Sequence, residues 1–328
     1  MSKWESAIER VGRTVARPRM GYTGRVRSQG REAERIARAV LNASCRPDAV
    51  LVSTFWWEKV KNFGDLLTPY LLRDCGIVPV LTPPAQADLV GVGSLVQHLP
   101  PDFGGALWGT GLVHDRRTEL PDATCLALRG DLTRDRMGSP HVDALGDPGL
   151  LVSRRVRRPG VSYDVGVVAH YVHADDEWLH DLVSGHPDHA NTVLPIDVAQ
   201  RPSAVARQVA SCRAIVSTSL HGVITADAFG IPAAWIRMPR SLYGGDFKFH
   251  DHESVVRPSG ARDIDAADVS SLAQVAAAAR PADMAAVERA QDGLIAAAAR
   301  IPDVVRHRRV PTWQIPLTGR GSVVHTHV

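Results

Sequence analysis

Short apolar runs, each ending at a glycine or a charged turn, recur along the chain from residue 50 onward. They occupy residues 50–55, 87–94, 106–111, 124–131, 163–171, 192–197, 214–216 and 233–237. Runs of this length that are rich in valine and leucine predict buried β-strands. Because helical patterns lie between them, we expect parallel sheets, whose ligands gather at the carboxyl ends of the strands.

Amphipathic or alanine-rich stretches between these runs predict the helices. They cover residues 66–71, 132–137, 176–183, 203–212, 223–229, 269–279 and 283–299. Pro69 fits the first of these helices only near its first turn, because proline farther inside removes a backbone donor. The last two are alanine-rich, and alanine is the strongest helix former.

A basic, proline-marked segment at residues 153–160 divides this pattern in two and predicts a linker. We therefore expect a basic N-terminal arm, two α/β domains and an extended tail, at residues 1–45, 46–155, 160–300 and 301–328. The expected fold class is α/β, with two Rossmann-like parallel-sheet domains that face a cleft. This arrangement resembles the GT-B-like architecture of many glycosyltransferases, in which the active site lies in the cleft.

The composition is typical of a globular protein. A chain of 328 residues, 45% of them hydrophobic and 22% charged, has room for two domains. The four cysteines are widely spaced without a C-x-x-C pair, which predicts reduced thiols. No apolar run approaches the roughly 18–20 residues that span a bilayer, and the start lacks an apolar signal region. We therefore expect a cytoplasmic protein.

Arginines outnumber glutamates in the N-terminal arm, where several glycines interrupt the chain. One interpretation is a solvated, partly disordered arm. The other is an arm that touches anionic lipid headgroups or a lipid-linked acceptor at the inner face of the membrane, because basic segments are drawn to such surfaces. The formal net charge of +3 is small and the arm lacks interleaved aromatic residues, so we expect no nucleic-acid partner.

Residues 213–232 are the most informative stretch. A β-branched run at 214–216 is followed by small polar residues and by helical spacing from Val223, which predicts a strand, a tight turn and a helix start. The N-terminus of such a helix offers free N–H groups to a phosphate or carboxylate. His221 would lie in the first turn, where the local field favours a neutral imidazole. The alternative is that Ser217 and Ser219 only cap the helix while His221 fills a packing gap.

The order Ser-Leu-His-Gly followed by Ala-Phe-Gly-Ile-Pro, within residues 219–232, resembles the signature of the polysaccharide pyruvyl transferase family. Further pieces of the family's pattern occur in the family's order. They are Asn62-Phe-Gly-Asp65, Leu128-Arg-Gly130, Leu132-Thr-Arg134, Gly146-Asp-Pro148, His170 after a strand, and Lys248-Phe249 with Asp251. Together they cover about residues 50–260. The arginine-rich arm and the histidine-rich ending do not match the family.

The resemblance implies that a pyruvyl group passes from phosphoenolpyruvate to a pair of hydroxyls on one sugar, forming a pyruvate ketal and releasing phosphate. The implied partners are phosphoenolpyruvate as co-substrate and a saccharide acceptor, with a lipid-linked acceptor among the alternatives. It implies no further cofactor and no metal. The scattered histidines, including those of the tail, also define no metal site.

Phosphoenolpyruvate carries a phosphate and a carboxylate, so its site must supply several cationic or N–H donor groups. Guanidinium groups bind both anions in a bidentate manner. Arg129, at a strand end beside a glycine turn, is the first candidate; the alternative is a surface arginine paired with Asp131 or Asp135. The other candidate binding residues are Lys248, Ser219, Gly222, Arg237 and Asn62.

The reaction also needs a general acid and a general base. His221 is the candidate for one proton transfer, and His170 or Asp65 for the other. A histidine at a strand end can equally serve only to satisfy local hydrogen bonds. Asn62 and Asp65 could bind acceptor hydroxyls or cap the following helix. Asp147, before a proline, is expected to form a turn rather than to act in catalysis.

Two other functions fit the same architecture. A glycosyltransferase with a nucleotide-sugar donor would need a carboxylate or backbone pocket for the nucleotide, and only Asp263-x-Asp265, in an expected loop, resembles one. A glycan-binding relative without turnover would keep the fold but not need the histidine and cationic residues. The oligomeric state is not predicted.

Overall fold

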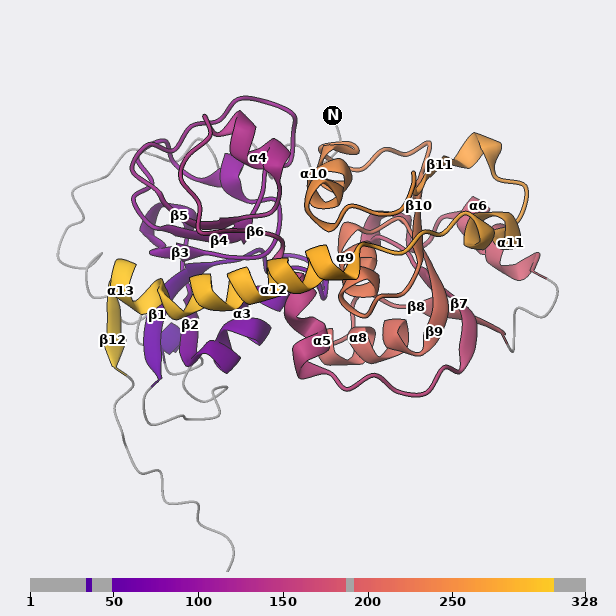
Figure 1. Ribbon diagram of the computed structural model, residues 1–328, viewed down its shortest axis with the longest axis horizontal. Coiled ribbons are helices and arrows are strands. Elements are labelled where there is room, and N and C mark those ends of the chain that lie inside the picture. The colour runs from indigo at the N-terminus through magenta and orange to yellow at the C-terminus, as the bar shows by residue number, and fades with distance from the viewer. Residues whose placement is uncertain (1–33, 37–48, 187–191, 310–328) are drawn as a thin grey trace, which may run out of the picture.

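The protein has two α/β lobes side by side, as the computed structural model in Figure 1 shows. The structure describes residues 34–36, 49–186 and 192–309. The predicted basic arm, apart from residues 34–36, and the part of the predicted tail beyond residue 309 lie outside the described residues. The predicted fold class is confirmed, since each lobe is built on a mainly or wholly parallel sheet.

The sheet of the first lobe runs in the order β12-β1-β3-β4-β5-β6, with β2 paired to β1. Its strands are β1 (Val50–Phe55), β2 (Ile77–Leu81), β3 (Leu89–Val90), β4 (Ala106–Thr110), β5 (Thr124–Leu128), β6 (Ala144–Leu145) and β12 (His307–Arg309). Only β12 is antiparallel, and it pairs with Val50–Val52 of β1. The helices near this sheet are α3 (Leu67–Leu72) and α4 (Asp131–Arg136), whereas α5 (Val152–Arg155) packs on α8 and α9 of the second lobe. The chain thus returns to the first lobe at its last described strand.

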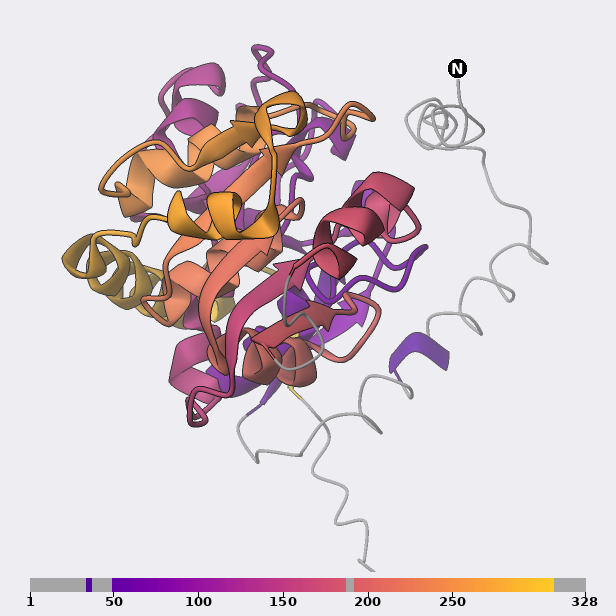
Figure 2. The same cartoon turned by 90° about the vertical axis from the view of Figure 1, so that its right-hand side faces the viewer.

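The second lobe has a wholly parallel sheet in the order β11-β10-β9-β7-β8. Its strands are β7 (Tyr163–Val168), β8 (Val193–Ile196), β9 (Cys212–Ser217), β10 (Ala233–Arg237) and β11 (Asp263–Asp265). One face packs on α6 (Glu177–Ser184) and α11 (Leu272–Ala277), which lie in front of the sheet in Figure 2. The other face packs on α8 (Pro202–Ala210) and α9 (Leu220–Ala228). Because neighbouring strand residues such as Ile215 and Val216 face opposite helix layers, the middle of β9 is apolar on both faces.

Helix α9 is the centre of the molecule. All nine of its residues are buried, because it lies between the second sheet and the first lobe, where it contacts the 3-10 turn Pro148–Leu151. A helix without a polar face is stable only when it is covered on all sides. The sequence Leu-His-Gly-Val-Ile-Thr-Ala-Asp-Ala meets this condition with three polar side chains. The hydroxyl of Thr225 donates to the His221 carbonyl within the helix, so His221 and Asp227 are the buried polar groups that require partners outside it.

Two further helices connect the lobes. The helix α10 (Phe247–Val256) packs on α4 of the first lobe and on α9 of the second. The long helix α12 (Met284–Ala299) crosses the front of the first lobe in Figure 1, reaches the second lobe near α9, and is followed by α13 (Ile301–Val304). The indole Nε1 of Trp108 on β4 donates a hydrogen bond to the Leu294 carbonyl of α12, with an N–O distance of 3.0 Å. The lobes therefore share a continuous core.

Most of the predicted elements are present with small shifts at their ends. The predicted linker is in part helical, as α5 covers Val152–Arg155. Residues 263–265, expected in a loop, form the edge strand β11. Cys125 and Cys212 are free thiols, as predicted, and burial raises the pKa of both to about 11.

Candidate functional site

The turn between β9 and α9 places His221 at the junction of the two lobes. The backbone N–H of Ser219 donates to Ser217 Oγ, which also lies 3.0 Å from the carbonyl oxygen of Val168 on the neighbouring strand. Ser219 is the N-cap residue, but its side chain makes no cap hydrogen bond. The predicted strand, turn and helix start are therefore confirmed, with Ser217 rather than Ser219 fixing the turn.

The His221 imidazole is enclosed by residues of the first lobe. Its ring meets the Phe63 ring edge to face, with 6.2 Å between centroids. A Cβ atom placed on Gly64 would lie 2.2 Å from His221 Nδ1, so only glycine leaves room for the ring at position 64. Burial, followed by the charges of Arg129 and Lys248, lowers the pKa of His221 to about 3. The neutral imidazole expected from the sequence is thus found, but burial is its first cause.

Asp147 is the nearest carboxylate to this ring. Its Oδ1 accepts a hydrogen bond from the Gly149 N–H at 2.8 Å, which confirms the predicted turn. Its Oδ2 lies 4.0 Å from His221 Nε2, and neither atom has a hydrogen-bond partner within the described residues. Burial raises the pKa of Asp147 to about 6. The His221 imidazole and the Asp147 carboxyl can therefore each form a hydrogen bond with a third group or exchange a proton with it.

Lys248, the second residue of α10, brings the positive charge to this site. Its side chain is buried, and the ammonium forms no ion pair with any carboxylate of the described chain. Burial and the nearby charge of Arg129 lower the pKa of Lys248 to about 8, although Asp246 and Asp65 act in the opposite direction. The charge of the same ammonium contributes to the lowered pKa values of His170 and His221, and it opposes the rise in the pKa of Asp65. These predicted residues therefore lie within the electrostatic influence of one cation.

His170 and Asp65 reach the site from opposite lobes. His170 follows β7, and its Nδ1 accepts a hydrogen bond from the Val172 N–H. Burial, with the charge of Lys248 next in size, lowers its pKa to about 3. Asp65 lies between β1 and α3, and burial raises its pKa to about 7. Asn62 donates to Asp65 Oδ2 and accepts from the Gly64 N–H, so it shapes the loop that carries Asp65.

Arg129 lies close to this group but is held by protein partners. Its guanidinium is fully buried and donates to Asp251 Oδ2 at 2.8 Å, to Ser94 Oγ and to the Leu112 carbonyl. Asp251 also accepts from the backbone N–H and the hydroxyl of Thr133. The surface pairing with Asp131 or Asp135 that the sequence left open does not occur. Arg129 instead joins β5 of the first lobe to α10 of the second.

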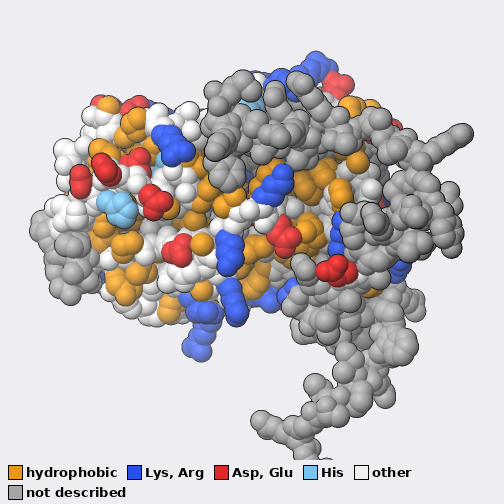
Figure 3. Space-filling view, turned by 180° about the vertical axis from the view of Figure 1, so that it is seen from behind, with side chains coloured by type: hydrophobic (Ala, Val, Ile, Leu, Met, Phe, Trp, Pro, Cys, Tyr) orange, Lys and Arg blue, Asp and Glu red, His pale blue; other side chains and the backbone are white. Residues whose placement is uncertain are grey.

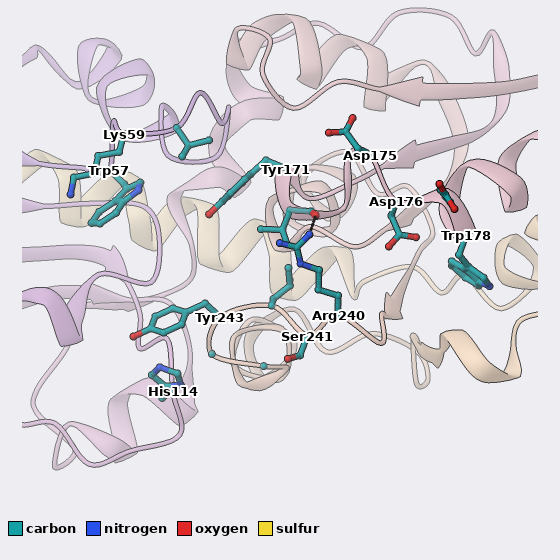
Figure 4. Close-up of a pocket in the computed structure, with 16 residues that line it drawn as sticks. Trp57, Lys59, His114, Tyr171, Asp175, Asp176, Trp178, Arg240, Ser241 and Tyr243 are labelled. Atoms are coloured by element: carbon teal, nitrogen blue, oxygen red, sulfur yellow. Dashed lines mark hydrogen bonds between the residues drawn. The ribbon is translucent and has the colours of Figure 1, made fainter. Parts of the chain in front are cut away.

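An open cavity of about 1110 Å³ lies beside these residues, between the two lobes. Figure 4 shows Trp57 and Lys59 of the first lobe on one side, with Tyr171 and Arg240 of the second lobe opposite. Tyr171 directly follows His170, and the two rings contact each other at a tilt of 35°, with centroids 4.3 Å apart. The charge of Asp65 contributes to a raised pKa of Tyr171, after burial. The cavity therefore adjoins the Lys248 site.

A family model described as polysaccharide pyruvyl transferase matches residues 53–238, which include most of these groups. The chain belongs to the polysaccharide pyruvyl transferase family. It is also 35% identical over 156 residues to the uncharacterized protein L143 of Acanthamoeba polyphaga mimivirus, a match that covers 45% of this chain and 53% of that protein. The chain thus spans about half the length of this relative.

Three other predicted binding residues of this pyruvyl transferase family member, Arg237, Gly222 and Asn62, have roles within the fold. Arg237 forms ion pairs with Asp263 and Asp265 of β11. A Cβ on Gly222 would lie 2.5 Å from Ser217 Oγ, so Gly222 allows α9 to approach the sheet. Asn62 holds the loop described above. None of these arrangements brings a free cation to the cavity.

Sequence reasoning missed two residues that shape the site. Asp251 was noted only as an acidic neighbour of Lys248, because the helix α10 was not predicted. Asp147 was assigned to a turn, and its second oxygen faces His221 only because α9 packs on the Pro148–Leu151 turn. Both contacts join segments far apart in the sequence, which no local pattern reveals.

A buried polar network connects α9 and α10 away from the cavity. Asp227 of α9 bonds to His252 of α10 at 2.8 Å and to Arg262 at 2.7 Å. Arg262 also donates to Glu253, which in turn accepts from the Trp235 indole. The polar residue Asp227 thus ties α9 to α10, the helix that carries Lys248.

The surface of the described residues in Figure 3 has no side of one charge. On the face opposite to that of Figure 1, Lys and Arg side chains are interspersed with acidic and apolar ones (Figure 3). Among residues 49–186 and 192–309, His, Cys, Asp and Glu side chains do not gather in a group of three suited to a metal ion. Of the helices in these ranges, none is both long and apolar enough to cross a membrane.

Proposed function

We propose that the protein transfers the pyruvyl group of phosphoenolpyruvate to two hydroxyls of one sugar in a glycan or glycoconjugate. The observation that carries the proposal is the buried Lys248 ammonium, which has no carboxylate partner in the described chain and acts electrostatically on Asp65, His170 and His221. A buried cation without a partner is costly, and a bound anion removes that cost. A phosphate and carboxylate donor fits this site, and family membership supports the choice of pyruvyl transfer.

The reaction needs three proton movements and a leaving phosphate. A proton is added to the methylene carbon of the donor, a sugar hydroxyl attacks the neighbouring carbon, and that hydroxyl gives up its proton. The bond to phosphate then breaks, a second hydroxyl of the same sugar attacks the same carbon to close the ketal, and the proton of this second hydroxyl leaves with the released phosphate. Lys248 stabilises the departing phosphate in this scheme, since a fixed cation is most effective where negative charge develops.

The pKa values favour one assignment of the proton carriers. Asp65, with a pKa of about 7, holds a proton in about half of the molecules at neutral pH and is the candidate donor to the methylene carbon. His221, with a pKa of about 3, is neutral and is the candidate base for the attacking hydroxyl. His170 is also neutral and is the alternative base. A phosphate bound beside His221 would raise its pKa and so help it to accept the proton.

The test is incubation with phosphoenolpyruvate and a panel of glycosides, with free phosphate and the mass of the glycoside both measured. We expect phosphate release to require the acceptor, and the acceptor to gain the mass of a ketal-linked pyruvate. His221→Ala and Lys248→Ala should abolish both signals. His141→Ala and Lys61→Ala, at exposed positions outside the site, are the matched controls and should keep them.

A nucleotide-sugar glycosyltransferase remains the second candidate, and the same panel tests it with a nucleotide-sugar donor in place of phosphoenolpyruvate. Asp263 and Asp265, the carboxylates that it would use, are ion-paired with Arg237. A glycan-binding protein without turnover would bind the glycoside but leave phosphoenolpyruvate intact. Sugar transfer in the absence of phosphoenolpyruvate, or binding alone, would overturn the proposal.

A further inference from the structure

The cavity between the lobes is too large for the donor alone. Its volume of about 1110 Å³ lies above the roughly 300–1,000 Å³ typical of small-molecule pockets. The Lys248 group, where the donor is proposed to bind, adjoins the cavity but does not line it. The cavity therefore has room for a second, larger ligand.

Four aromatic side chains of Trp and Tyr line this space. Trp178 of α6 is one, and each of the other three comes from a different segment of the chain. Trp57 follows β1 in the first lobe, Tyr171 follows β7, and Tyr243 lies in the loop between β10 and α10. Tyr171 and Tyr243 are 38% and 46% exposed, unusual values for large side chains with apolar rings. In Figure 4 the two phenol rings extend from the second lobe toward the side on which Trp57 lies.

Each of the other three rings, those of Trp57, Tyr171 and Tyr243, contacts a histidine ring. Trp57 lies against His98 with centroids 5.7 Å apart, Tyr243 meets His114 edge to face at 4.7 Å, and Tyr171 contacts His170 in a tilted arrangement at 4.3 Å. Burial lowers the pKa of all three imidazoles, so they are neutral aromatic partners at neutral pH. Rings held in this way lose little conformational freedom when a ligand binds, which favours affinity.

The loop that carries Tyr243 is fixed against the first lobe. Gly244 has a φ of +88°, and a Cβ there would lie 2.2 Å from the Val113 carbonyl oxygen. The glycine therefore allows the loop backbone to touch the opposite lobe, next to His114. The Tyr243 ring is placed by this contact across the cavity.

Polar groups complete the lining. Lys59 and Arg240 supply donors, and the exposed Asp175 supplies an acceptor. Aromatic faces alternating with such groups match a pyranose chain, because each sugar ring has an apolar C–H face and a rim of hydroxyls. A nucleotide base would also stack, but the acidic side chains at 175–177 would repel its phosphates.

We propose that this cavity binds an oligosaccharide segment of more than one sugar residue, with Trp57, Tyr171 and Tyr243 as stacking platforms. The sugar on Tyr171 lies next to His170 and Asp65 and is the one that receives the pyruvyl group, while the rings of Trp57 and Tyr243 hold its neighbours. The assignment of the reacting sugar rests on the proposed function; the oligosaccharide site itself does not.

The test is binding of the full chain, without phosphoenolpyruvate, to glucose, galactose, mannose and N-acetylglucosamine oligosaccharides of increasing length, starting from the monosaccharide. We expect at least one series to gain about tenfold or more in affinity from the monosaccharide to the trisaccharide. Trp57→Ala and Tyr243→Ala should each remove about fivefold to tenfold of that gain, as expected for the loss of one aromatic contact. Trp57→Phe and Tyr243→Phe should keep most of it, and Ile295→Ala, an exposed apolar residue on α12, should change nothing.

Failure of this inference can be told apart from failure of the proposed function. If no oligosaccharide binds, if length has no effect, or if the alanine variants bind as well as the wild type, the site is overturned. Phosphate release with monosaccharide and trisaccharide at equal KM would overturn it too, yet keep the pyruvyl transfer. Length-dependent binding without phosphate release would keep the site and overturn the transfer.

Discussion

His221 Nε2 and Asp147 Oδ2 face each other at 4.0 Å, and neither atom has another hydrogen-bond partner within the described residues. The separation is too long for a hydrogen bond. Leaving two buried polar atoms unpaired costs free energy, so the arrangement indicates a functional reason. A hydroxyl or phosphate oxygen entering beside His221 would let the imidazole take a proton while Asp147 stabilises the resulting charge.

Asp147→Asn should therefore lower kcat about tenfold to a hundredfold while leaving KM for phosphoenolpyruvate nearly unchanged. The amide keeps the bond from the Gly149 N–H but removes the charge opposite the imidazole. Steady-state kinetics of phosphate release measures the effect. An unchanged kcat would show that Asp147 acts only in the turn.

The dependence of kcat/KM on pH should reveal the deprotonation of Lys248. Its pKa is lowered to about 8, so the ammonium that binds the donor is lost as the pH rises above that value. We expect kcat/KM for phosphoenolpyruvate to fall about tenfold per pH unit on the alkaline side, because kcat/KM reports groups of the free enzyme. Lys248→Arg should shift the alkaline fall of kcat/KM to higher pH, since a guanidinium stays charged. Lys61→Arg is the control, and an alkaline limb unmoved by Lys248→Arg would refute the role of Lys248.

Gly64→Ala should disturb His221 directly. The added Cβ would lie 2.2 Å from His221 Nδ1, so the ring must leave its place. We expect a loss of activity of about a hundredfold or more, with a smaller effect on the denaturation midpoint than a core truncation gives. Gly160→Ala adds the same methyl group in open space and should leave both activity and midpoint unchanged. Full activity of Gly64→Ala would mean that the position of the imidazole is unimportant.

The pair Arg129–Asp251 should matter for stability. Both side chains are fully buried, and removing one partner leaves an uncompensated charge. Arg129→Met should lower the free energy of unfolding by about 3–5 kcal/mol, and Arg129→Met with Asp251→Leu by less. Urea denaturation measures both variants. The exposed pair Arg136–Asp115 is the control, where Arg136→Met should have a much smaller effect on the free energy of unfolding. Equal costs at the two pairs would contradict the role of the buried one.

The sequence was most informative where the pattern is local. The strand, turn and helix start at residues 212–228 follow from an apolar run and small polar residues, and the structure has β9 and α9 there. The strand β1 was likewise predicted with its observed ends. Helix α10 was missed, because Lys-Phe-His-Asp-His-Glu lacks the apolar spacing of an amphipathic helix and gains its stability from contacts with α4, α9 and α12.

For the candidate site, the sequence could propose residue types but not their partners. Arg129 was expected to bind an anion. Its guanidinium instead donates hydrogen bonds to Asp251, Ser94 and the Leu112 carbonyl. That outcome depends on how α10 docks on the first lobe, which no nearby residue specifies. Asp65 and His170 were predicted from motifs, whereas their shifted pKa values arise from burial between the lobes.

The course of α12 has a consequence for how the molecule unfolds. The helix packs on α9 and α10 and also on β4, β5 and β6, and the strand that follows it pairs with β1. Neither lobe can unfold without exposing apolar surface of the other to water, so heat or denaturant should unfold both in one cooperative transition. A chain cut before Met284 would leave the Trp108 indole without its acceptor and the two halves prone to aggregate.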